Sequence, residues 1–180
     1  MINILFVCHG NICRSPMAEY IMKDKIKKRA LLSQIYVSSK ATSREEIGND
    51  IYPPAKKVLR EHQIHFDRHH ASQITKNDYH YYDYILVMDY YNLSNIKRIV
   101  GEDKNNKIHM LLEYTNLYNG EISDPWYSGN FDRTYSEIDA ACEGLLDYII
   151  RNHYNNLVIF LILIAILIML SYNYSYNYKI

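Results

Sequence analysis

Short apolar runs alternate along the chain with longer segments in which apolar residues recur at helical spacing. The apolar runs predict strands over residues 2–7, 34–38, 84–88 and 108–112. The helical spacing predicts helices over residues 17–30, 53–63, 92–100 and 132–153. Strands that alternate with helices predict an α/β fold, a single three-layer domain in which helices flank a four-stranded parallel sheet.

The last part of the chain departs from this pattern. Residues 157–170 are fourteen consecutive apolar residues, beginning with Leu157 and ending with Leu170, and a repeat of tyrosine and asparagine follows them. As a helix this run would be about 21 Å long, which is short of the roughly 30 Å hydrocarbon layer of a bilayer. We therefore predict a domain over residues 1–154 and a hydrophobic tail over residues 155–180. Three roles stay open for the tail: weak membrane association, self-association or packing, and no selected role.

Composition sets further bounds. Twenty basic residues balance 20 acidic ones, so no net charge attracts nucleic acid. Residues 1–7 carry neither a positive region nor a long apolar stretch, which predicts that there is no secretory signal peptide. The cysteines are odd in number (Cys8, Cys13 and Cys142), and this favours a reducing compartment over a disulfide framework. These features predict a cytoplasmic protein, and they favour neither a monomer nor an oligomer.

The segment from Cys8 to Ser15 lies between the first predicted strand and the first predicted helix. A helix N-terminus presents unpaired N–H groups and the positive end of the helix dipole, which together make an anion site. Gly10 and Asn11 tolerate the left-handed backbone that turns successive N–H groups inward. Pro16 is favoured in a first helical turn and is expected to mark the start of the helix. The segment is therefore predicted to be a phosphate-binding loop after strand 1.

Side chains of this loop suit phosphoryl transfer. A thiol such as Cys8, near a helix N-terminus and a guanidinium, favours the thiolate, which is the nucleophilic form. Arg14 offers a planar fork that binds two phosphate oxygens, and Ser15 can donate a hydrogen bond to the sulfur. A Walker-type nucleotide loop is excluded, because its Gly-x4-Gly-Lys-Ser/Thr spacing does not occur in the chain.

A phosphatase that uses a thiolate also needs a group that protonates the leaving oxygen. Residues 123–127 supply Asp124, and Pro125 biases this residue toward an extended backbone. The adjacent Trp126 and Tyr127 would give Asp124 a partly dry setting that favours the protonated acid. Asp124 is therefore the candidate general acid.

The string Val-Cys-x-Gly-Asn-Ile-Cys-Arg-Ser-Pro near the start of the chain, with Asp-Pro-aromatic-aromatic further on, resembles the low-molecular-weight protein tyrosine phosphatase family. The resemblance covers roughly residues 2–152. It implies that phosphotyrosine-containing proteins are hydrolysed through a phosphocysteine, with Cys8 as nucleophile, Arg14 as phosphate ligand and Asp124 as general acid and base. It implies no metal and no cofactor. The substrate-binding residues that it implies are His9, Gly10, Asn11, Ile12, Cys13, Ser15, Trp126 and Tyr127.

The resemblance carries further expectations. Ser39 would hydrogen-bond Asn11 and hold its backbone, and Cys13 would trap an oxidised Cys8 as a disulfide. Arginine phosphatases of this fold tend to have Thr at the position of Ile12, so this chain is expected to act on phosphotyrosine. One departure weighs against tight binding of the phosphotyrosine ring: the opposite wall of the pocket, often aromatic in the family, corresponds to Glu45 or its neighbours.

The alternatives are a protein-arginine phosphatase, an arsenate reductase and a non-enzymatic phosphate-binding module. Arsenate reduction passes electrons through further cysteines, and residues 76–100 contain none. The presence of both Arg14 and Asp124 argues against a module without activity. A zinc site built from Cys8, Cys13 and nearby histidines lacks the paired spacing of zinc ligands.

Overall fold

The computed structural model describes residues 1–116 and 120–177 of the chain, which divides into two compact units, Met1–Leu145 and Leu146–Ile180. The strands of the first unit are β1 (Ile2–Cys8), β2 (Ile35–Ala41), β3 (Tyr84–Val87) and β4 (Ile108–Met110). They form one parallel sheet in the order β2-β1-β3-β4. The helices are α1 (Arg14–Lys28), α2 (Pro53–Glu61), α3 (Lys76–Tyr81), α4 (Tyr90–Val100), the 3-10 helix η1 (Leu111–Tyr114), α5 (Pro125–Ser128) and α6 (Phe131–Asn177). The predicted fold class is confirmed.

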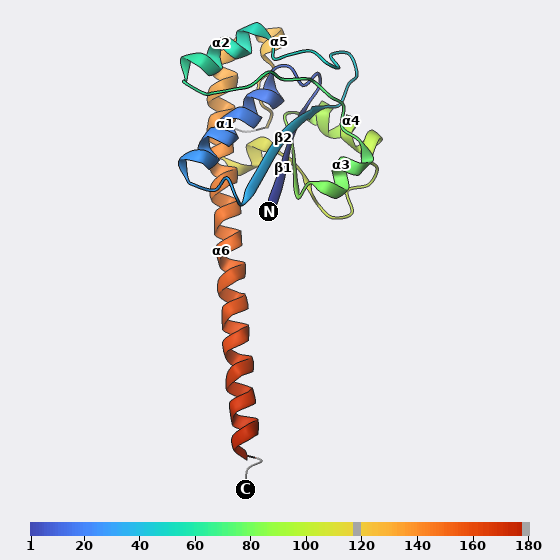
Figure 1. Ribbon diagram of the computed structural model, residues 1–180. Helices are drawn as coiled ribbons and strands as arrows, with labels where there is room; N and C mark the ends of the chain where they lie inside the picture. The colour runs from blue at the N-terminus through green and yellow to red at the C-terminus, as the bar shows by residue number, and fades with distance from the viewer. Residues whose placement is uncertain (117–119, 178–180) are drawn as a thin grey trace. The chain divides into compact units, whose positions relative to one another are not determined.

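Helices cover both faces of the sheet. Figure 1 shows α1 and α2 on one side of β1 and β2, and α3 and α4 on the other side. The strand β1 is central, and its residues from Ile4 to Val7 are fully buried, as the two-sided burial of a parallel sheet requires. The first turns of α6 pack on α1, where the Cys142 sulfur lies 3.8 Å from the carbonyl oxygen of Ala18.

The register brings the functional ends of the strands together. Cys8 pairs with Ala41 of β2, and Val7 pairs with Val87 of β3. The carboxyl ends of these strands therefore meet at one edge of the sheet, which is the edge where open α/β sheets bind ligands. The loop that follows Cys8 lies at this edge.

The element boundaries differ from the predicted ones in several places. Helix α1 begins at Arg14, so Pro16 is the third helical residue, a position whose N–H also needs no helical partner. Strand β4 ends at Met110 and η1 follows it, and the short helices α3 and α5 were not predicted. The predicted end of the last helix near residue 153 was wrong, because α6 continues to Asn177. Residues 145–177 contain no proline or glycine that would stop it.

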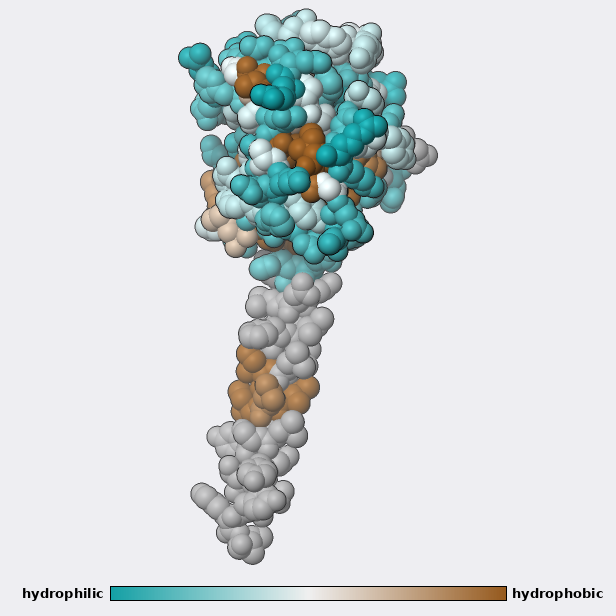
Figure 2. Space-filling model, turned by 90° about the vertical axis from the view of Figure 1, so that its right-hand side faces the viewer, coloured by the Kyte–Doolittle hydropathy of each residue, from teal (hydrophilic) through white to brown (hydrophobic). Residues whose placement is uncertain are grey.

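The second unit consists of the continuation of α6. Leu146 and Ile149 at its start are buried, whereas the described apolar side chains further along are exposed and belong to the brown part of this helix in Figure 2: Ile164, Ile166, Leu167 and Ile168. Within residues 1–116 and 120–177, no helix is both long and apolar enough to cross a membrane. The predicted boundary at residues 154–155 stays a prediction.

Candidate active site

The loop between β1 and α1 surrounds the sulfur of Cys8 with polar groups. Cys8 ends β1 and is 3% exposed. Its Sγ lies 3.0 Å from the Ser15 hydroxyl oxygen and accepts a hydrogen bond from the Asn11 N–H at 3.3 Å. Asn11 Nδ2 also donates to the Ser15 oxygen at 3.0 Å, and the Ser15 hydroxyl has two acceptors for its own proton, the sulfur at 3.0 Å and the Lys40 carbonyl oxygen at 3.4 Å. This arrangement stabilises negative charge on the sulfur.

Asn11 suits the loop through its backbone conformation, whereas Gly10 suits it through its small size. Asn11 has a φ of 59°, in the left-handed region, as the sequence predicted. Gly10 is outside that region, so the prediction of a left-handed backbone there was wrong. At Gly10 space is the constraint, because a Cβ would lie 3.1 Å from Cγ of Glu46.

Every polar group of the Asn11 side chain is used to hold the loop. Its Nδ2 donates to the Ser39 hydroxyl at 2.8 Å, the contact that the family resemblance implied. Its Oδ1 accepts from the backbone N–H of Ser72 at 3.1 Å. His69 Nε2 donates to the Asn11 backbone carbonyl at 2.9 Å. Burial lowers the pKa of His69, which keeps its ring neutral for this contact.

Two supporting residues were missed by the sequence analysis. The buried Glu19 accepts a hydrogen bond from Ser39 at 2.6 Å and pairs with Lys23. His69 comes from the connection between α2 and α3, 58 residues after Asn11. No local sequence signal identifies either contact, because both depend on how distant segments pack.

Arg14 lies between two carboxylates. Its Nη1 is 2.7 Å from Asp89 Oδ2 and its Nη2 is 2.6 Å from Asp124 Oδ2. Its side chain is only 3% exposed. Burial opposes the charge of Arg14, but Cys8, Asp124 and Asp89 outweigh it, so the pKa of Arg14 is raised. The guanidinium is therefore charged and oriented before a substrate arrives.

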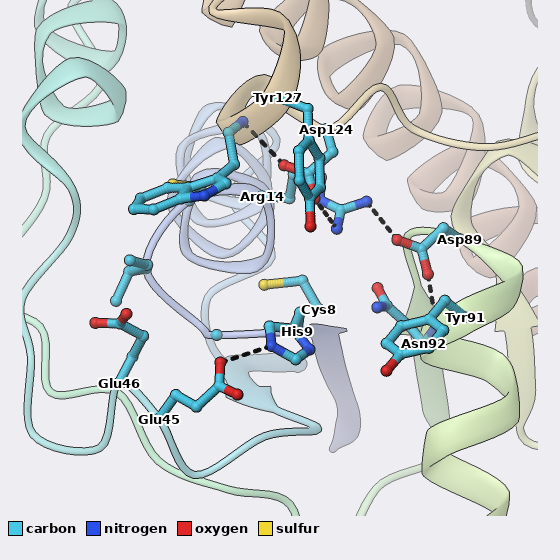
Figure 3. A pocket seen from close by; sticks show the side chains of 14 residues that line it. Cys8, His9, Arg14, Glu45, Glu46, Asp89, Tyr91, Asn92, Asp124 and Tyr127 are labelled. Atoms are coloured by element: carbon cyan, nitrogen blue, oxygen red, sulfur yellow. Dashed lines mark hydrogen bonds and ion pairs between the residues drawn. The ribbon is translucent and has the colours of Figure 1, made fainter.

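Asp89 is a site residue that the sequence analysis did not single out. It follows β3 and caps the N-terminus of α4, where its Oδ1 accepts from the Asn92 N–H at 2.5 Å. Its position in the sequence could have identified it, because it stands at the carboxyl end of a parallel strand beside β1. Figure 3 shows Asp89 and Asp124 on opposite sides of the Arg14 guanidinium.

Asp124 stands over the loop from a distant part of the chain. It caps the short helix α5 by accepting from the Trp126 N–H at 3.0 Å through Oδ1. Its other oxygen, Oδ2, takes the ion pair with Arg14. The carboxyl group thus faces the same cavity as Cys8, which it reaches across 116 residues of chain.

The cavity has a volume of about 640 Å³. Most of the predicted substrate-binding residues line it, namely His9, Gly10, Ile12, Cys13, Trp126 and Tyr127. Asn11 and Ser15 are buried in the loop and are not among its lining residues. The lining also includes Glu45, Glu46, Tyr91 and Asn92. The wall expected near Glu45 is thus formed by two carboxylates, and Tyr91 and Asn92 were not predicted.

The mouth of the cavity is aromatic and acidic (Figure 3). Trp126 and Tyr127 are 56% and 88% exposed, and the Trp126 ring lies 5.3 Å from that of Tyr52. On the opposite side, His9 Nε2 is 2.9 Å from Glu45 Oε2. A flat ring that enters the cavity would therefore pass exposed aromatic faces.

Cys13 and Cys142 are the other two cysteines of the chain. Burial, together with the proximity of Cys8 and Asp124, raises the pKa of Cys13 to about 12, so Cys13 is a thiol at neutral pH. Burial also raises the pKa of Cys142, which lies away from the cavity in α6. Within the described part of the chain, no three His, Cys, Asp or Glu residues are grouped to hold a metal ion.

The sheet, the loop and the converging acid define the class of cysteine-dependent phosphatases. The profile of the low molecular weight phosphotyrosine protein phosphatase family matches residues 3–155. The low molecular weight protein-tyrosine-phosphatase PtpA of Staphylococcus epidermidis is 36% identical over 152 residues, which are 84% of this chain and 96% of that protein. The chain belongs to the low molecular weight phosphotyrosine protein phosphatase family.

Solved structures agree with this assignment. YfkJ from Bacillus subtilis superposes with a TM-score of 0.82 at 37% identity, covering 84% of this chain and 96% of that one. The Drosophila arginine phosphatase DARP superposes with a TM-score of 0.73 at 31% identity, covering 81% of this chain and 96% of that one. Structures similar to this chain therefore include an enzyme that is named an arginine phosphatase.

Proposed function

We propose that the chain hydrolyses phosphotyrosine in proteins through a phosphocysteine intermediate. The observation that carries the proposal is the convergence of Cys8, Arg14 and Asp124, from three separate elements, on one cavity of about 640 Å³. Aromatic side chains at its mouth suit a flat phenyl ring, and Ile12 adds an apolar contact inside.

In the first step, the Cys8 thiolate attacks phosphorus, so that an S–P bond forms as the bond to the phenolic oxygen breaks. The phosphate dianion competes with Asp124 for Nη2 of Arg14, and this frees the Asp124 carboxyl group to carry a proton. Asp124 then gives this proton to the departing oxygen. Asp89 keeps its hold on Nη1 and thereby fixes the plane of the guanidinium.

In the second step, Asp124 acts as a base. As a carboxylate it takes a proton from a water molecule whose oxygen attacks phosphorus, while the S–P bond breaks and the thiolate of Cys8 returns. The Ser15 hydroxyl, 3.0 Å from the sulfur, stabilises the thiolate as a leaving group. The products are inorganic phosphate and the free enzyme.

Turnover of p-nitrophenyl phosphate and of a phosphotyrosine peptide tests the proposal. Cys8→Ser should abolish turnover, and Asp124→Ala should slow the first step on the peptide by about 10²- to 10⁴-fold, the usual contribution of a general acid. Full activity of Cys8→Ser would refute the proposal. A preference for phosphoarginine over phosphotyrosine peptides would move the assignment to protein-arginine phosphatase.

We further infer that Cys13 protects Cys8 by forming a reversible disulfide after oxidation. The support is that both cysteines line the same cavity. Mass spectrometry of the peroxide-treated full-length protein should find a Cys8–Cys13 linkage. Oxidation of Cys8 to the sulfinic acid without this linkage would count against the inference.

A cytoplasmic location is also proposed, on the support of an odd number of cysteines with a reactive thiol among them. Weak membrane association through residues 157–170 remains one of three roles for the tail. Fractionation of cells that express the full chain separates membrane association from the other two roles, since an associated protein sediments with membranes and is released by detergent.

A further inference from the structure

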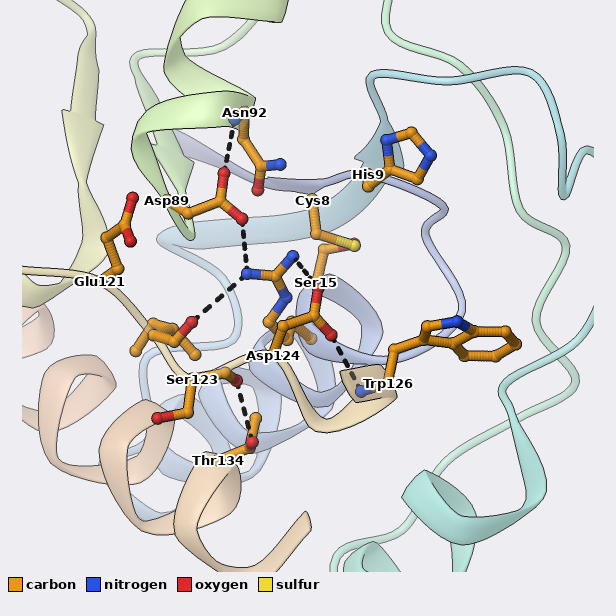
Figure 4. A network of polar contacts seen from close by, with 12 residues as sticks. Cys8, His9, Ser15, Asp89, Asn92, Glu121, Ser123, Asp124, Trp126 and Thr134 are labelled. Carbon is orange, nitrogen blue, oxygen red and sulfur yellow. Dashed lines mark hydrogen bonds and ion pairs between the residues drawn. The ribbon is translucent and has the colours of Figure 1, made fainter. Parts of the chain in front are cut away.

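Helix α6 holds the backbone of the residue that precedes Asp124. Glu137 Oε2 accepts a hydrogen bond from the Ser123 N–H at 2.7 Å, and its Oε1 accepts from the Ser123 hydroxyl at 2.9 Å. The Thr134 hydroxyl donates to the Ser123 carbonyl oxygen at 3.0 Å, a contact drawn in Figure 4. All polar groups of Ser123 are thus bound by one turn of α6.

A carboxylate in this position is costly. The Glu137 side chain is 2% exposed, and a charge taken out of water costs free energy unless it is paired and hydrogen-bonded. Its only cationic contact among the described residues is Arg133 Nε at 2.8 Å, and the Arg133 side chain is 65% exposed. An apolar residue at 137 would pack in α6 without this cost. The two hydrogen bonds from Ser123 offset part of the cost of burying this carboxylate.

The neighbouring contacts show what a shift of this segment would disturb. Ile122 donates its N–H to the Met88 carbonyl at 2.8 Å, and its own carbonyl accepts from Arg14 at 3.3 Å. Asp124 then places its carboxyl group 2.6 Å from Arg14. Ser123 lies between Ile122 and Asp124 in the chain, so a change in its position moves the Asp124 carboxyl group relative to the cavity.

We propose that Glu137 is a positioning residue for the general acid: through Ser123 it determines where the Asp124 carboxyl group stands over the phosphoryl group. The inference rests on the proposed role of Asp124 as proton donor. A misplacement of about 1 Å in a catalytic group costs up to about 100-fold in rate. The effect should fall on proton donation rather than on the attack of Cys8, because Glu137 touches neither the loop of Cys8 nor the cavity.

Aryl phosphates whose leaving groups differ in basicity isolate this effect. Phenyl phosphate needs protonation of its leaving oxygen, whereas 2,4-dinitrophenyl phosphate releases a weakly basic phenolate that does not. In the full-length protein, Glu137→Gln should lower kcat/KM for phenyl phosphate about 10-fold and change the dinitrophenyl value by less than about 2-fold. Asp124→Asn should show the same selectivity with a larger loss.

Matched controls separate positioning from stability. Glu143→Gln makes the same substitution on the same helix and removes ion pairs with Lys25 and Arg29, but it should leave both substrates within about 2-fold. Ser123→Ala, which keeps the N–H contact to Glu137, should show a smaller selective loss, with Ser136→Ala as its control. If Glu137→Gln does not fold, Ser123→Ala and its control still test the positioning role.

Each outcome has one meaning. Equal losses on both substrates, or no loss, in Glu137→Gln and Ser123→Ala would overturn the positioning role. An Asp124→Asn variant without leaving-group selectivity would instead overturn the proposed general acid. Selective loss in both the Asp124 and the Glu137 variants supports the inference.

Discussion

Substitution of Asp89 tests how Arg14 is held. This carboxylate has two functions, because Oδ2 pairs with Nη1 of Arg14 at 2.7 Å and Oδ1 caps α4 through the Asn92 N–H at 2.5 Å. Asp89→Ala removes both contacts. Asp89→Asn keeps a good helix cap but removes the charge beside the guanidinium.

The magnitudes follow from burial. The side chains of Arg14 and Asp89 are 3% and 16% exposed, so solvent screens their ion pair only weakly. A hydrogen bond to a charged group contributes about 1.5–3 kcal/mol, and a helix cap contributes about 1 kcal/mol. We expect a loss of about 3 kcal/mol in the free energy of unfolding for Asp89→Ala and about 1–2 kcal/mol for Asp89→Asn. Arg14 keeps Asp124 and the Ile122 carbonyl in both variants.

Urea unfolding of the full-length protein measures these differences. Trp126 is the only tryptophan in the sequence and lies beside the cavity, so its fluorescence reports on this region. Both variants should also show a higher KM for aryl phosphates, because the guanidinium plane is no longer fixed. Equal stabilities for the two variants would refute the separation of cap and charge. A loss below about 0.5 kcal/mol in Asp89→Ala would refute the role of the ion pair.

Other predictions concern the support of the loop and the packing of α6. The pKa of His69 is lowered from its ordinary 6.5, so the unfolded chain binds a proton first as the pH falls; the free energy of unfolding should decrease below about pH 6.5. His69→Gln should remove this part of the pH dependence, and an unchanged slope in urea titrations would contradict it. Ser39→Ala should cost about 1–2 kcal/mol, because Asn11 Nδ2 loses its 2.8 Å partner; a wild-type urea midpoint would count against this. Gly144→Ala should destabilise by about 2–3 kcal/mol despite the better helix propensity of alanine, because its Cβ would lie 1.8 Å from the Tyr114 carbonyl oxygen. A raised melting temperature in that variant would show that the contact relaxes freely.

Much of this protein could be predicted from local patterns. The order of strands and helices, the parallel sheet and the loop after Cys8 depend on hydrophobic periodicity and on residues that are close in sequence. The left-handed backbone of Asn11 is a property of one residue type in a tight loop. The end of α6 was mispredicted because a change in composition was taken for a change in structure, although no helix-breaking residue is present.

The tertiary structure decided which distant groups meet. The two carboxylates on Arg14 come from 75 and 110 residues away, and no spacing rule connects them. The hold of His69 on Asn11 and of Glu137 on Ser123 likewise arises only when separate segments pack. A buried polar group must find a partner wherever the fold offers one, so these contacts depend on three-dimensional proximity. The chain's local order determined the loop and its nucleophile, whereas the folded sheet and its helices determined how the arginine and the acid are held over it.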